Sequence, residues 1–364
     1  MDSTASGLDF AIIGHQDSWQ NITSFINTLR KPDLPELSIE QIKKVFPFIP
    51  PGKIYKIEVT SITGKKVKGA YIETFIEPDK LTAAHARNNV CKVMKAIAHA
   101  TKIGAKIVTL GGFTSIVLEG KLAVLSKGPS QFTTGNTLTA AFIVKAIEKA
   151  ACQRNIQLCK STVLIIGATG DIGMACVEYF KNKVGQLLLC ARNKSRLQHV
   201  SNKLIKEQIA VKISICLNEL IAEADIIIGV ASSSNLNLAG CKPGVIICDA
   251  GYPKNMDAAF DNIPLNKSFH GGMGQVTGGY SFMPDYSQQV YSFPVPHVSY
   301  GCTLEAVVLA LESKYEAYSF GKGNITVDSM EEMYSLCQKH GIILSPFYNS
   351  NGLCKMEGAP VINF

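Results

Sequence analysis

The chain has 364 residues, of which 46% are hydrophobic and 18% charged, and its formal net charge is +7. This composition excludes intrinsic disorder, and the length suffices for two domains with a large core. The basic residues form no run of five or six, so we expect no nucleic-acid partner, whereas their excess favours an acidic one. No apolar run approaches the ~20 residues that cross a bilayer, so we expect no membrane span.

The eleven cysteines are scattered, without a Cys-x-x-Cys pair, and no histidine cluster completes a zinc pattern. We therefore expect reduced thiols, no bound metal and a cytoplasmic protein. The first seven residues contain no basic residue and no long apolar segment, and so do not resemble a signal peptide.

Residues 1–135 are predicted to form an N-terminal α/β substrate domain. Alternation of apolar residues indicates strands, whereas apolar residues three and four positions apart indicate helices. The predicted elements are a strand at 10–14, a proline-dotted loop with one short helix at 32–51, strands at 54–60 and 66–76, a helix at 80–104 and a strand at 105–110.

Two loops of this domain are candidates for contact with a substrate. One, residues 111–115, contains Gly112, Phe113 and Ser115, and it follows a predicted strand directly. The other precedes a helix predicted over 137–155 and offers the hydroxyls of Thr133 and Thr134 and an amide. The amide belongs to Asn136. Such side chains either cap a helix or hydrogen-bond a substrate carbonyl, and the residues leave both interpretations open.

The most informative segment is Val163-Leu-Ile-Ile-Gly-Ala-Thr-Gly-Asp-Ile-Gly173, an apolar run that ends at three glycines spaced by two residues. This spacing is typical of a strand, a tight turn and a helix N-terminus that hold the pyrophosphate of a dinucleotide. An ordinary glycine-rich turn is the alternative. The predicted cofactor-binding residues of this turn are Gly167, Ala168, Thr169, Gly170, Asp171, Ile172 and Gly173.

The end of the next predicted strand, 186–191, favours NADP(H) over NAD(H). An NAD site usually places an acidic residue there to bind the ribose hydroxyls. This chain has Arg192 and Asn193 instead, followed by Lys194 and Arg196, and these cations suit a 2′-phosphate. A solvated basic turn would give the same residues.

Two further buried strands are predicted within the segments 224–234 and 244–254, the first of which ends in small polar residues. Parallel strands carry their ligands at their carboxyl ends, so the residues after these strands are candidates for the nicotinamide half of the site. They are Val230, Ala231, Ser232 and Gly251. The fold class predicted is α/β, a Rossmann-type doubly wound parallel sheet with an N-terminal α/β substrate domain and a C-terminal helical return. The expected ranges are 1–135 for the substrate domain, 136–160 for a connecting helix, 161–295 for the NADP(H)-binding domain and 296–364 for the return.

Several unusual motifs occur together in one order along the chain. They are Leu110-Gly-Gly-Phe-Thr-Ser-Ile116, Phe132-Thr-Thr-Gly-Asn-Thr137, Gly167-Ala-Thr-Gly-Asp-Ile-Gly173, Ala191-Arg-Asn193, Gly251-Tyr-Pro-Lys-Asn255, Gly323-Asn-Ile-Thr-Val327 and Lys339-His-Gly341. Together they resemble the long-chain acyl-[acyl-carrier-protein] reductases of the cyanobacterial alkane pathway. The resemblance runs from about residue 12 to about residue 343. It implies NADPH-dependent reduction of a fatty acyl thioester to an aldehyde through a cysteine acyl-enzyme.

The resemblance assigns the nucleophile to Cys302 of Cys302-Thr-Leu-Glu305-Ala306. A helix is predicted to begin near Ser299, so Cys302 would lie in its first turn, where the helix dipole stabilises a thiolate. Glu305, one turn further on, is a candidate to move a proton or orient the thiol, and otherwise its charge favours the helix N-terminus. Without the resemblance, a buried spectator cysteine would be the ordinary interpretation.

The expected partner is an acidic acyl carrier protein, or CoA carrying the same acyl group, and an aldehyde-consuming enzyme would follow. A lysine cluster in the first domain is a candidate docking surface or simply a solvated face. Its members are Lys43, Lys44, Lys53, Lys56, Lys65, Lys66 and Lys68. His15 and His297 are candidate general acids, although ordinary loop histidines are the commoner case.

Two segments depart from the resembled family: the glycine- and tyrosine-rich stretch 271–291, and a long tail at 345–364. They leave the acyl class open. Two other functions also remain open, a shikimate- or quinate-dehydrogenase-like alcohol oxidoreductase and a non-enzymatic NADP(H)-binding regulator.

Overall fold

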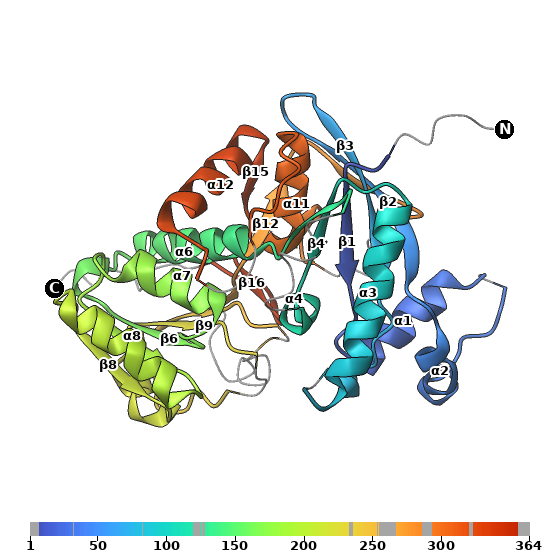
Figure 1. Ribbon diagram of the computed structural model, residues 1–364. Helices are drawn as coiled ribbons and strands as arrows, with labels where there is room; N and C mark the ends of the chain where they lie inside the picture. The colour runs from blue at the N-terminus through green and yellow to red at the C-terminus, as the bar shows by residue number, and fades with distance from the viewer. Residues whose placement is uncertain are drawn as a thin grey trace. The chain divides into compact units, whose positions relative to one another are not determined.

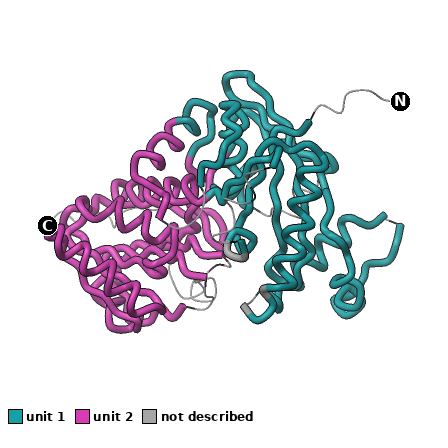
Figure 2. The backbone as a smooth tube through the Cα atoms, in the orientation of Figure 1, with its two compact units in different colours: residues 1–135, 276–321, 336–343 teal, residues 136–275, 322–335, 344–364 magenta. Residues whose placement is uncertain are grey.

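The computed structural model describes residues 7–31, 33–81, 83–118, 125, 128–232, 236–252, 254, 267–285, 293–319 and 323–355. The chain divides into two compact units (Figures 1 and 2). Unit 1 consists of Met1–Gly135, Val276–Gly321 and Leu336–Ile343, and unit 2 of Asn136–Gln275, Lys322–Ser335 and Leu344–Phe364. The chain therefore returns to each unit more than once, so residues beyond 275 do not follow the expected division at 295.

Unit 1 is built on a six-stranded sheet of order β13-β2-β3-β1-β4-β5. The strands are β1 (Phe10–Gly14), β2 (Gly52–Thr60), β3 (Lys66–Glu73), β4 (Ile107–Leu110), β5 (Gln131–Thr133) and β13 (Tyr280–Met283). Strands β3, β1, β4 and β5 are parallel, whereas β2 is antiparallel to β3 and to β13. The carboxyl ends of the four parallel strands therefore share one edge of the sheet.

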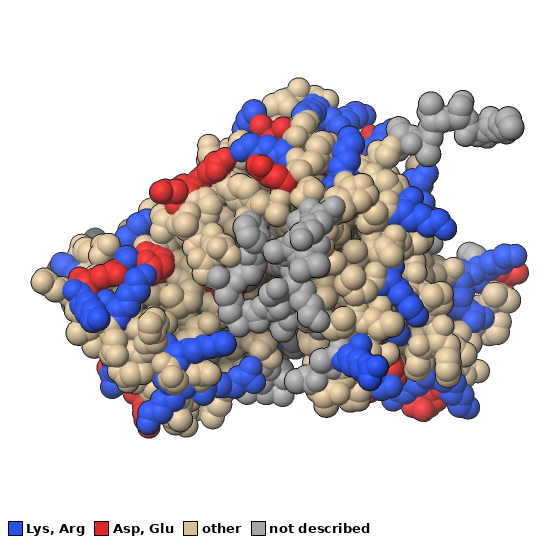
Figure 3. Space-filling view, viewed as in Figure 1, with Lys and Arg blue, Asp and Glu red and all other residues tan. Residues whose placement is uncertain are grey.

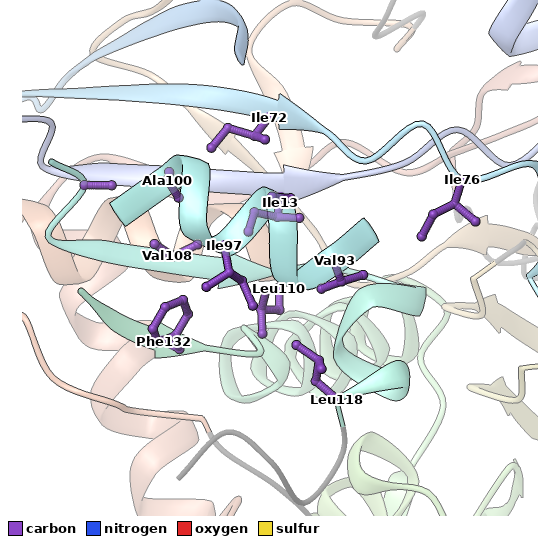
Figure 4. Packing of buried hydrophobic residues seen from close by; sticks show 13 residues of the cluster. Ile13, Ile72, Ile76, Val93, Ile97, Ala100, Val108, Leu110, Leu118 and Phe132 are labelled. Atoms are coloured by element: carbon purple, nitrogen blue, oxygen red, sulfur yellow. The ribbon is translucent and has the colours of Figure 1, made fainter. Parts of the chain in front are cut away.

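Helices cover both faces of this sheet. On one face, α3 (Ala86–Lys102) packs its apolar side chains on a buried cluster that includes Ile13, Ile72 and Leu110 (Figure 4). On the other face, α11 (Gly301–Leu311) contacts β4, β1 and β3. Every residue of α11 except Cys302 is buried, so it is a central helix of the unit rather than an amphipathic surface helix.

Shorter helices complete unit 1: α1 (Trp19–Leu29), α2 (Ile39–Val45) and α4 (Phe113–Val117). The 3-10 turns are η1 (Phe46–Phe48), η2 (Pro78–Lys80) and η3 (Ala83–His85). The helix predicted over 80–104 thus begins only at Ala86, after two 3-10 turns, and the strand predicted over 66–76 ends at Glu73. Helix α1 was not predicted from the sequence. Its N-cap residue is Ser18, whose side chain accepts a hydrogen bond from the N–H of Asn21.

Unit 2 contains a six-stranded, wholly parallel sheet of order β11-β10-β9-β6-β7-β8. The strands are β6 (Thr162–Ile166), β7 (Gln186–Cys190), β8 (Val211–Ser214), β9 (Ile226–Gly229), β10 (Ile246–Asp249) and β11 (Ser268–His270). Counted along the chain, this order is 3-2-1-4-5-6, which is the doubly wound Rossmann order. The predicted fold class is confirmed. The strand order reverses between β6 and β9, where such sheets bind their ligands.

The helices of unit 2 are α6 (Asn136–Gln153), α7 (Asp171–Phe180) and α8 (Lys194–Lys206), with 3-10 turns η4 (Leu158–Lys160), η5 (Leu217–Glu219) and η6 (Ile221–Glu223). Helix α6, the expected connecting helix, packs on α7 and β10. The chain passes between the units within β12 (Met273–Val276), α12 (Val327–Lys339) and β15 (Ile342–Leu344), while β14 (Val298–Tyr300) leads directly into α11.

The two segments that the sequence could not assign are partly described. Residues 271–285 contain β12 and β13, and the remainder of 271–291 lies outside the described residues. The tail forms a hairpin of β16 (Tyr348–Asn349) and β17 (Gly352–Leu353), and the Asn349 amide donates hydrogen bonds to Ser268 of β11. Within the described ranges no helix is both long and apolar enough for a bilayer crossing.

Candidate active site

Cys302 lies in the first turn of α11, as the sequence predicted, and Tyr300 is the N-cap residue. The main-chain carbonyl of Cys302 accepts a hydrogen bond of 2.7 Å from the hydroxyl of Thr109 in β4. Unlike the rest of α11, Cys302 is partly exposed. The start of the helix is therefore fixed to the sheet, and the one partly exposed residue of the helix carries the thiol.

Two glycines make room for Cys302 at the carboxyl ends of β4 and β5. A Cβ atom at Gly135 would lie 2.2 Å from the Cα and 2.6 Å from the Cβ of Cys302. A Cβ atom at Gly111 would lie 3.2 Å from the Sγ of Cys302. The backbone of Cys302 therefore lies over Gly135, and its sulfur is directed to Gly111. No residue with a side chain would leave this space at Gly135, whose φ of +70° also favours glycine.

The thiol of Cys302 is not the activated thiolate that its place at a helix N-terminus suggested. Cys302 as a whole residue is partly exposed, but its sulfur is directed to Gly111 and is buried. This burial raises the pKa of the thiol to about 11, and the nearby Glu305 carboxylate raises the pKa further. Hydrogen bonds from the backbone and hydroxyl of Thr303 act in the opposite direction but do not outweigh the burial. The expected lowering of this pKa is therefore wrong, because the loss of solvation exceeds the effect of the helix end. The thiol of Cys302 is therefore protonated at neutral pH.

Glu305 is completely buried and does not serve as an exposed acid at the helix N-terminus. Its carboxylate accepts a very short hydrogen bond from the hydroxyl of Thr133 in β5. That hydroxyl also accepts the N–H groups of Ser319 at 3.2 Å and Gly135 at 3.3 Å. The N–H of Thr134 donates to the carbonyl of Ser319 at 2.8 Å. Thr133 and Thr134 thus fix the glycine loop beside Cys302.

The loop 111–115 leads into α4 and is fixed by its own hydroxyls. The Ser115 hydroxyl donates to the carbonyl of Gly112 at 2.8 Å, and the main-chain N–H of Phe113 donates to Nε2 of His15 at 3.3 Å. His15 is buried, which lowers its pKa, so it is neutral at pH 7 and suited to accept that bond. His297 is exposed and has a φ of +62° in the turn before β14.

A buried polar group that was not predicted from the sequence lies at the same edge of the sheet. The hydroxyl of Tyr71 donates to Oε2 of Glu73 at 2.8 Å, and the Gln16 amide donates to that oxygen at 3.1 Å. The other carboxylate oxygen of Glu73 accepts the N–H of Phe75 at 3.0 Å. Glu73 is completely buried, and burial raises its pKa to about 7 although these hydrogen bonds oppose the shift. The only sequence signal for this group was the alternation of apolar and polar residues along β3. That alternation did not indicate which face of the sheet a helix covers.

The predicted cofactor residues of unit 2 gather at the carboxyl ends of its strands. Gly167, with a φ of +92°, closes the turn after β6, and a Cβ atom at Gly173 would lie 2.2 Å from its carbonyl oxygen. Gly170 is the N-cap residue of α7 and brings no side-chain cap, and the N-terminus of a helix favours an anion. This glycine cradle fits the pyrophosphate of a dinucleotide.

The neighbouring loops complete this edge of unit 2. A Cβ atom at Gly167 would lie 2.9 Å from the N of Ala231 and the carbonyl of Val230, so the loop after β9 lies against the glycine turn. Nη2 of Arg192, after β7, lies 3.4 Å from the Ser232 hydroxyl. Both side chains are exposed, and no acidic residue occupies the end of β7. The arrangement suits a phosphorylated ribose.

Three other predicted residues have structural partners here. The Asn193 side chain caps α8 by accepting the N–H of Arg196 at 2.9 Å. The N–H of Gly251 donates to the buried Asp249 carboxylate at the end of β10. The Asn136 amide donates to Asp171 at 2.9 Å, next to the glycine turn. Asn136 had been expected to face a substrate carbonyl. Among the described residues, no group of three or more His, Cys, Asp or Glu side chains could hold a metal ion.

Several known proteins are similar to this chain over part or most of its length. Residues 149–267 match the Shikimate / quinate 5-dehydrogenase family. The chain is 32% identical over 349 residues to a long-chain acyl-[acyl-carrier-protein] reductase of Synechococcus elongatus, covering 91% of this chain and 97% of that protein. It is 26% identical over 300 residues to the aminotransferase PigE of Serratia sp., covering 79% of this chain and 34% of that protein. The solved L-tryptophan dehydrogenase of Nostoc punctiforme is 13% identical with a TM-score of 0.38, covering 92% of this chain and 80% of that one.

Proposed function

Because this chain belongs to the long-chain acyl-[acyl-carrier-protein] reductase family, we propose that it reduces a fatty acyl thioester to a fatty aldehyde through an acyl group carried on Cys302. The observation that carries the proposal is the seating of Cys302. Two glycines at the ends of parallel strands accommodate the residue, and Thr109 holds its carbonyl. An ordinary packed cysteine would not need this arrangement.

NADPH is the proposed cofactor, held by the glycine turn from Gly167 to Gly173 and by Arg192 with Ser232. When bound, it supplies the hydride. Arg192, Lys194 and Arg196 are all exposed at or near the end of β7, and an Asp or Glu that would prefer an unmodified ribose is missing there. These residues support NADPH over NADH.

The chemistry of Cys302 has two halves. In the first, the sulfur bonds to the thioester carbonyl carbon, the bond from that carbon to the carrier sulfur breaks, and the departing carrier thiolate takes up the proton lost by the Cys302 thiol. In the second, the acyl-cysteine gains a hydride and a proton, the bond between carbon and sulfur breaks, and aldehyde and free Cys302 result. An oxyanion forms in both halves and needs hydrogen-bond donors. The main-chain N–H groups at the start of α11 are the proposed donors, because the Phe113 N–H of the loop 111–115 already donates to His15.

Hydroxyls are weaker candidates for this role than the sequence suggested. Ser115 and Thr133 already donate to Gly112 and Glu305, and the Asn136 amide donates to Asp171. Each would have to give up a bond to serve the substrate. Glu305, bound to Thr133, is proposed to position the start of α11 rather than to exchange protons with solvent.

An acidic acyl carrier protein is the proposed donor of the substrate. Figure 3 shows Lys and Arg side chains over the β2–β3 hairpin at the top of the view. Lys53 and Lys56 of β2 and Lys68 of β3 are exposed. Burial lowers the pKa of His99, and the charges of Lys53 and Lys102 lower it further. We propose this hairpin surface as the landing site, in a cytoplasmic enzyme that passes its aldehyde to a second enzyme.

The proposal is tested by measuring aldehyde formation with NADPH from the same long-chain acyl group on acyl carrier protein and on CoA. Wild type, Cys302→Ser and Cys91→Ser are compared, since Cys91 is an exposed cysteine of α3 with no part in the site. We expect Cys302→Ser to abolish aldehyde formation and Cys91→Ser to retain it. Full activity of Cys302→Ser would defeat the proposal and favour a cysteine-free alcohol oxidoreductase.

A further inference from the structure

Three glycines stand side by side where β1, β4 and β5 of unit 1 end. Ile13 pairs with Leu110 in the ladder between β1 and β4, so Gly14 and Gly111 follow as the next neighbours. Thr109 pairs with Thr133 between β4 and β5, so Gly111 and Gly135 are neighbours two residues later. We call Gly14, Gly111 and Gly135 the glycine row.

The glycine row faces α11. The hydroxyl of Thr109 reaches the carbonyl of Cys302, so the side chain of Thr109 points to α11. Residues two positions apart in a strand share a face, and directly paired residues of parallel strands do so as well. The side of the row that lacks side chains is therefore the side on which the thiol lies.

Two polar groups fill the space above the row. The sulfur of Cys302 lies over Gly111, 3.2 Å from where a Cβ atom would be. The hydroxyl oxygen of Tyr71 lies over Gly14, 2.6 Å from where a Cβ atom would be. Neighbouring strands are about 4.8 Å apart, so the sulfur and the hydroxyl occupy adjacent places at one sheet edge. A side chain at Gly14 would displace the Tyr71 hydroxyl, and one at Gly111 would crowd the sulfur of Cys302.

Tyr71 is in turn joined to a buried carboxylate. Its hydroxyl donates to Glu73 at 2.8 Å, and the Gln16 amide lies within 3.1 Å of the same carboxylate oxygen and 3.4 Å of the Tyr71 oxygen. The Tyr71 ring stacks on Tyr55 with centroids 4.9 Å apart and an angle of 5°, which fixes its direction. The carboxylate of Glu73, the hydroxyl of Tyr71 and the thiol of Cys302 therefore follow one another along the glycine row.

We propose that Tyr71 and Glu73 form a proton-transfer pair for the thiol of Cys302, with Tyr71 as the catalytic residue and Glu73 as the positioning residue that holds the proton. This inference rests on the proposed function of Cys302 as a nucleophile. As the bond between sulfur and carbonyl carbon forms, the thiol proton passes to the oxygen of Tyr71, which gives its own proton to Glu73. When the carrier thiolate leaves, the proton returns to it by the same route, and Glu73 is again ionised.

The thiol of Cys302 needs a base, because its position at a helix N-terminus does not ionise it. The thiol is protonated at neutral pH because burial raises its pKa to about 11, and Glu73 is partly ionised near pH 7. Other titratable groups face these residues. Glu305 and Tyr280 interact with Cys302, whereas the charge of Lys92, from α3, interacts with Glu73. Glu305 is the competing base, and the test must separate it from Glu73.

Two readouts on the full-length protein test the inference between pH 5.5 and 9. One is the rate of Cys302 alkylation by iodoacetamide, followed by peptide mass. The other is the rate of acyl transfer from a long-chain acyl-CoA to Cys302 without NADPH, followed by intact mass. The variants are Tyr71→Phe, which keeps the ring stack, Glu73→Gln and Glu305→Gln. The control is Tyr315→Phe, which also removes a hydroxyl bonded to a carboxylate, 3.1 Å from Asp9.

We expect wild type and Tyr315→Phe to show an inflection near pH 7 in both rates. Tyr71→Phe should slow both rates at least tenfold, and Glu73→Gln should remove the inflection. Unchanged rates in Tyr71→Phe, or an inflection lost in Glu305→Gln but kept in Glu73→Gln, would overturn the pair. Normal alkylation behaviour without any acyl adduct would instead refute the proposed function and leave the pair standing.

Discussion

The hydroxyl of Thr109 donates a hydrogen bond of 2.7 Å to the main-chain carbonyl of Cys302. This single bond joins the end of β4 to the first turn of α11, although the two residues are far apart in sequence. Since Thr109 is completely buried, no water can replace its hydroxyl.

Thr109→Val, which keeps the shape but removes the donor, leaves the Cys302 carbonyl without this partner. We expect a loss of roughly 1 to 3 kcal/mol in the free energy of unfolding, because a buried acceptor loses its bond. We also expect several-fold slower acylation of Cys302 in the folded variant. Urea denaturation and intact mass measure the two effects. If Thr109→Val had the stability and the Cys302 acylation rate of the wild type, the bond would not position the nucleophile.

Gly135→Ala should be far more damaging than a comparable glycine change elsewhere. Both Gly135 and Gly64 have positive φ, +70° and +83°, so alanine at either position is strained by about 1–2 kcal/mol. Only at Gly135 would the new Cβ atom meet the backbone of Cys302, whereas nothing lies within 4 Å at Gly64. Thermal denaturation should place Gly135→Ala well below Gly64→Ala. Equal melting temperatures would contradict the described seating of Cys302.

Arg192→Ala should raise the KM for NADPH about tenfold, equivalent to about 1.4 kcal/mol, and leave the KM for NADH nearly unchanged. The reason is that the 2′-phosphate is the group that distinguishes the two cofactors. Lys206→Ala, in the last turn of α8, serves as the control for loss of one exposed cation in the same unit. Steady-state kinetics with both cofactors measure the effect. A parallel rise in both KM values would place Arg192 outside the phosphate site.

Glu73→Gln should stabilise the fold at high pH while it impairs the reaction. The pKa of Glu73 is raised from 4.5 in the unfolded chain to about 7 in the folded protein. The folded state therefore binds more protons between these values, and the free energy of unfolding falls as pH rises through that interval. The free energy of unfolding of the variant should exceed that of the wild type by about 3 kcal/mol at pH 8 and should equal it below pH 4.5. If the variant and the wild type differed in stability by the same amount at pH 4 and at pH 8, the raised pKa of Glu73 would be refuted.

Lys53→Glu with Lys56→Glu should slow the reaction with acyl carrier protein and affect acyl-CoA less. Opposite charges accelerate association, so the difference from wild type should shrink as salt is added. Lys160→Glu with Lys206→Glu, two exposed lysines of unit 2, makes the same change in net charge. The measurement is kcat/KM for each acyl donor at several salt concentrations. An equal loss in both double variants would mean that net charge, not the hairpin surface, determines docking.

The nucleotide-binding half was predictable because its signals are local. Gly167, Gly170 and Gly173 report a backbone geometry within a few residues, and the absence of an acid after β7 is equally local. The same reasoning succeeded for the position of Cys302, since a helix start depends on nearby residues. The doubly wound sheet followed from the succession of buried strands and helices.

The chemistry around Cys302 was not predictable in the same way. The alternation of β3 places Tyr71 and Glu73 on one face of the sheet, but that face is covered by a helix more than 200 residues later. The burial of Glu305 and the raised pKa of Cys302 have the same origin, because the apolar pattern of α11 suggested one buried side, whereas the helix is buried all round. Tertiary packing, not local propensity, determined these properties.

The central claim is that Cys302 carries the acyl group between donor and aldehyde. The most direct measurement is the mass of the protein after incubation with a long-chain acyl-carrier-protein thioester without NADPH, followed by peptide mapping. We predict one added acyl mass that maps to Cys302 and disappears, with release of one equivalent of aldehyde, when NADPH is added. Aldehyde formation without any acyl adduct, or an adduct on another cysteine that NADPH discharges equally, would contradict the account.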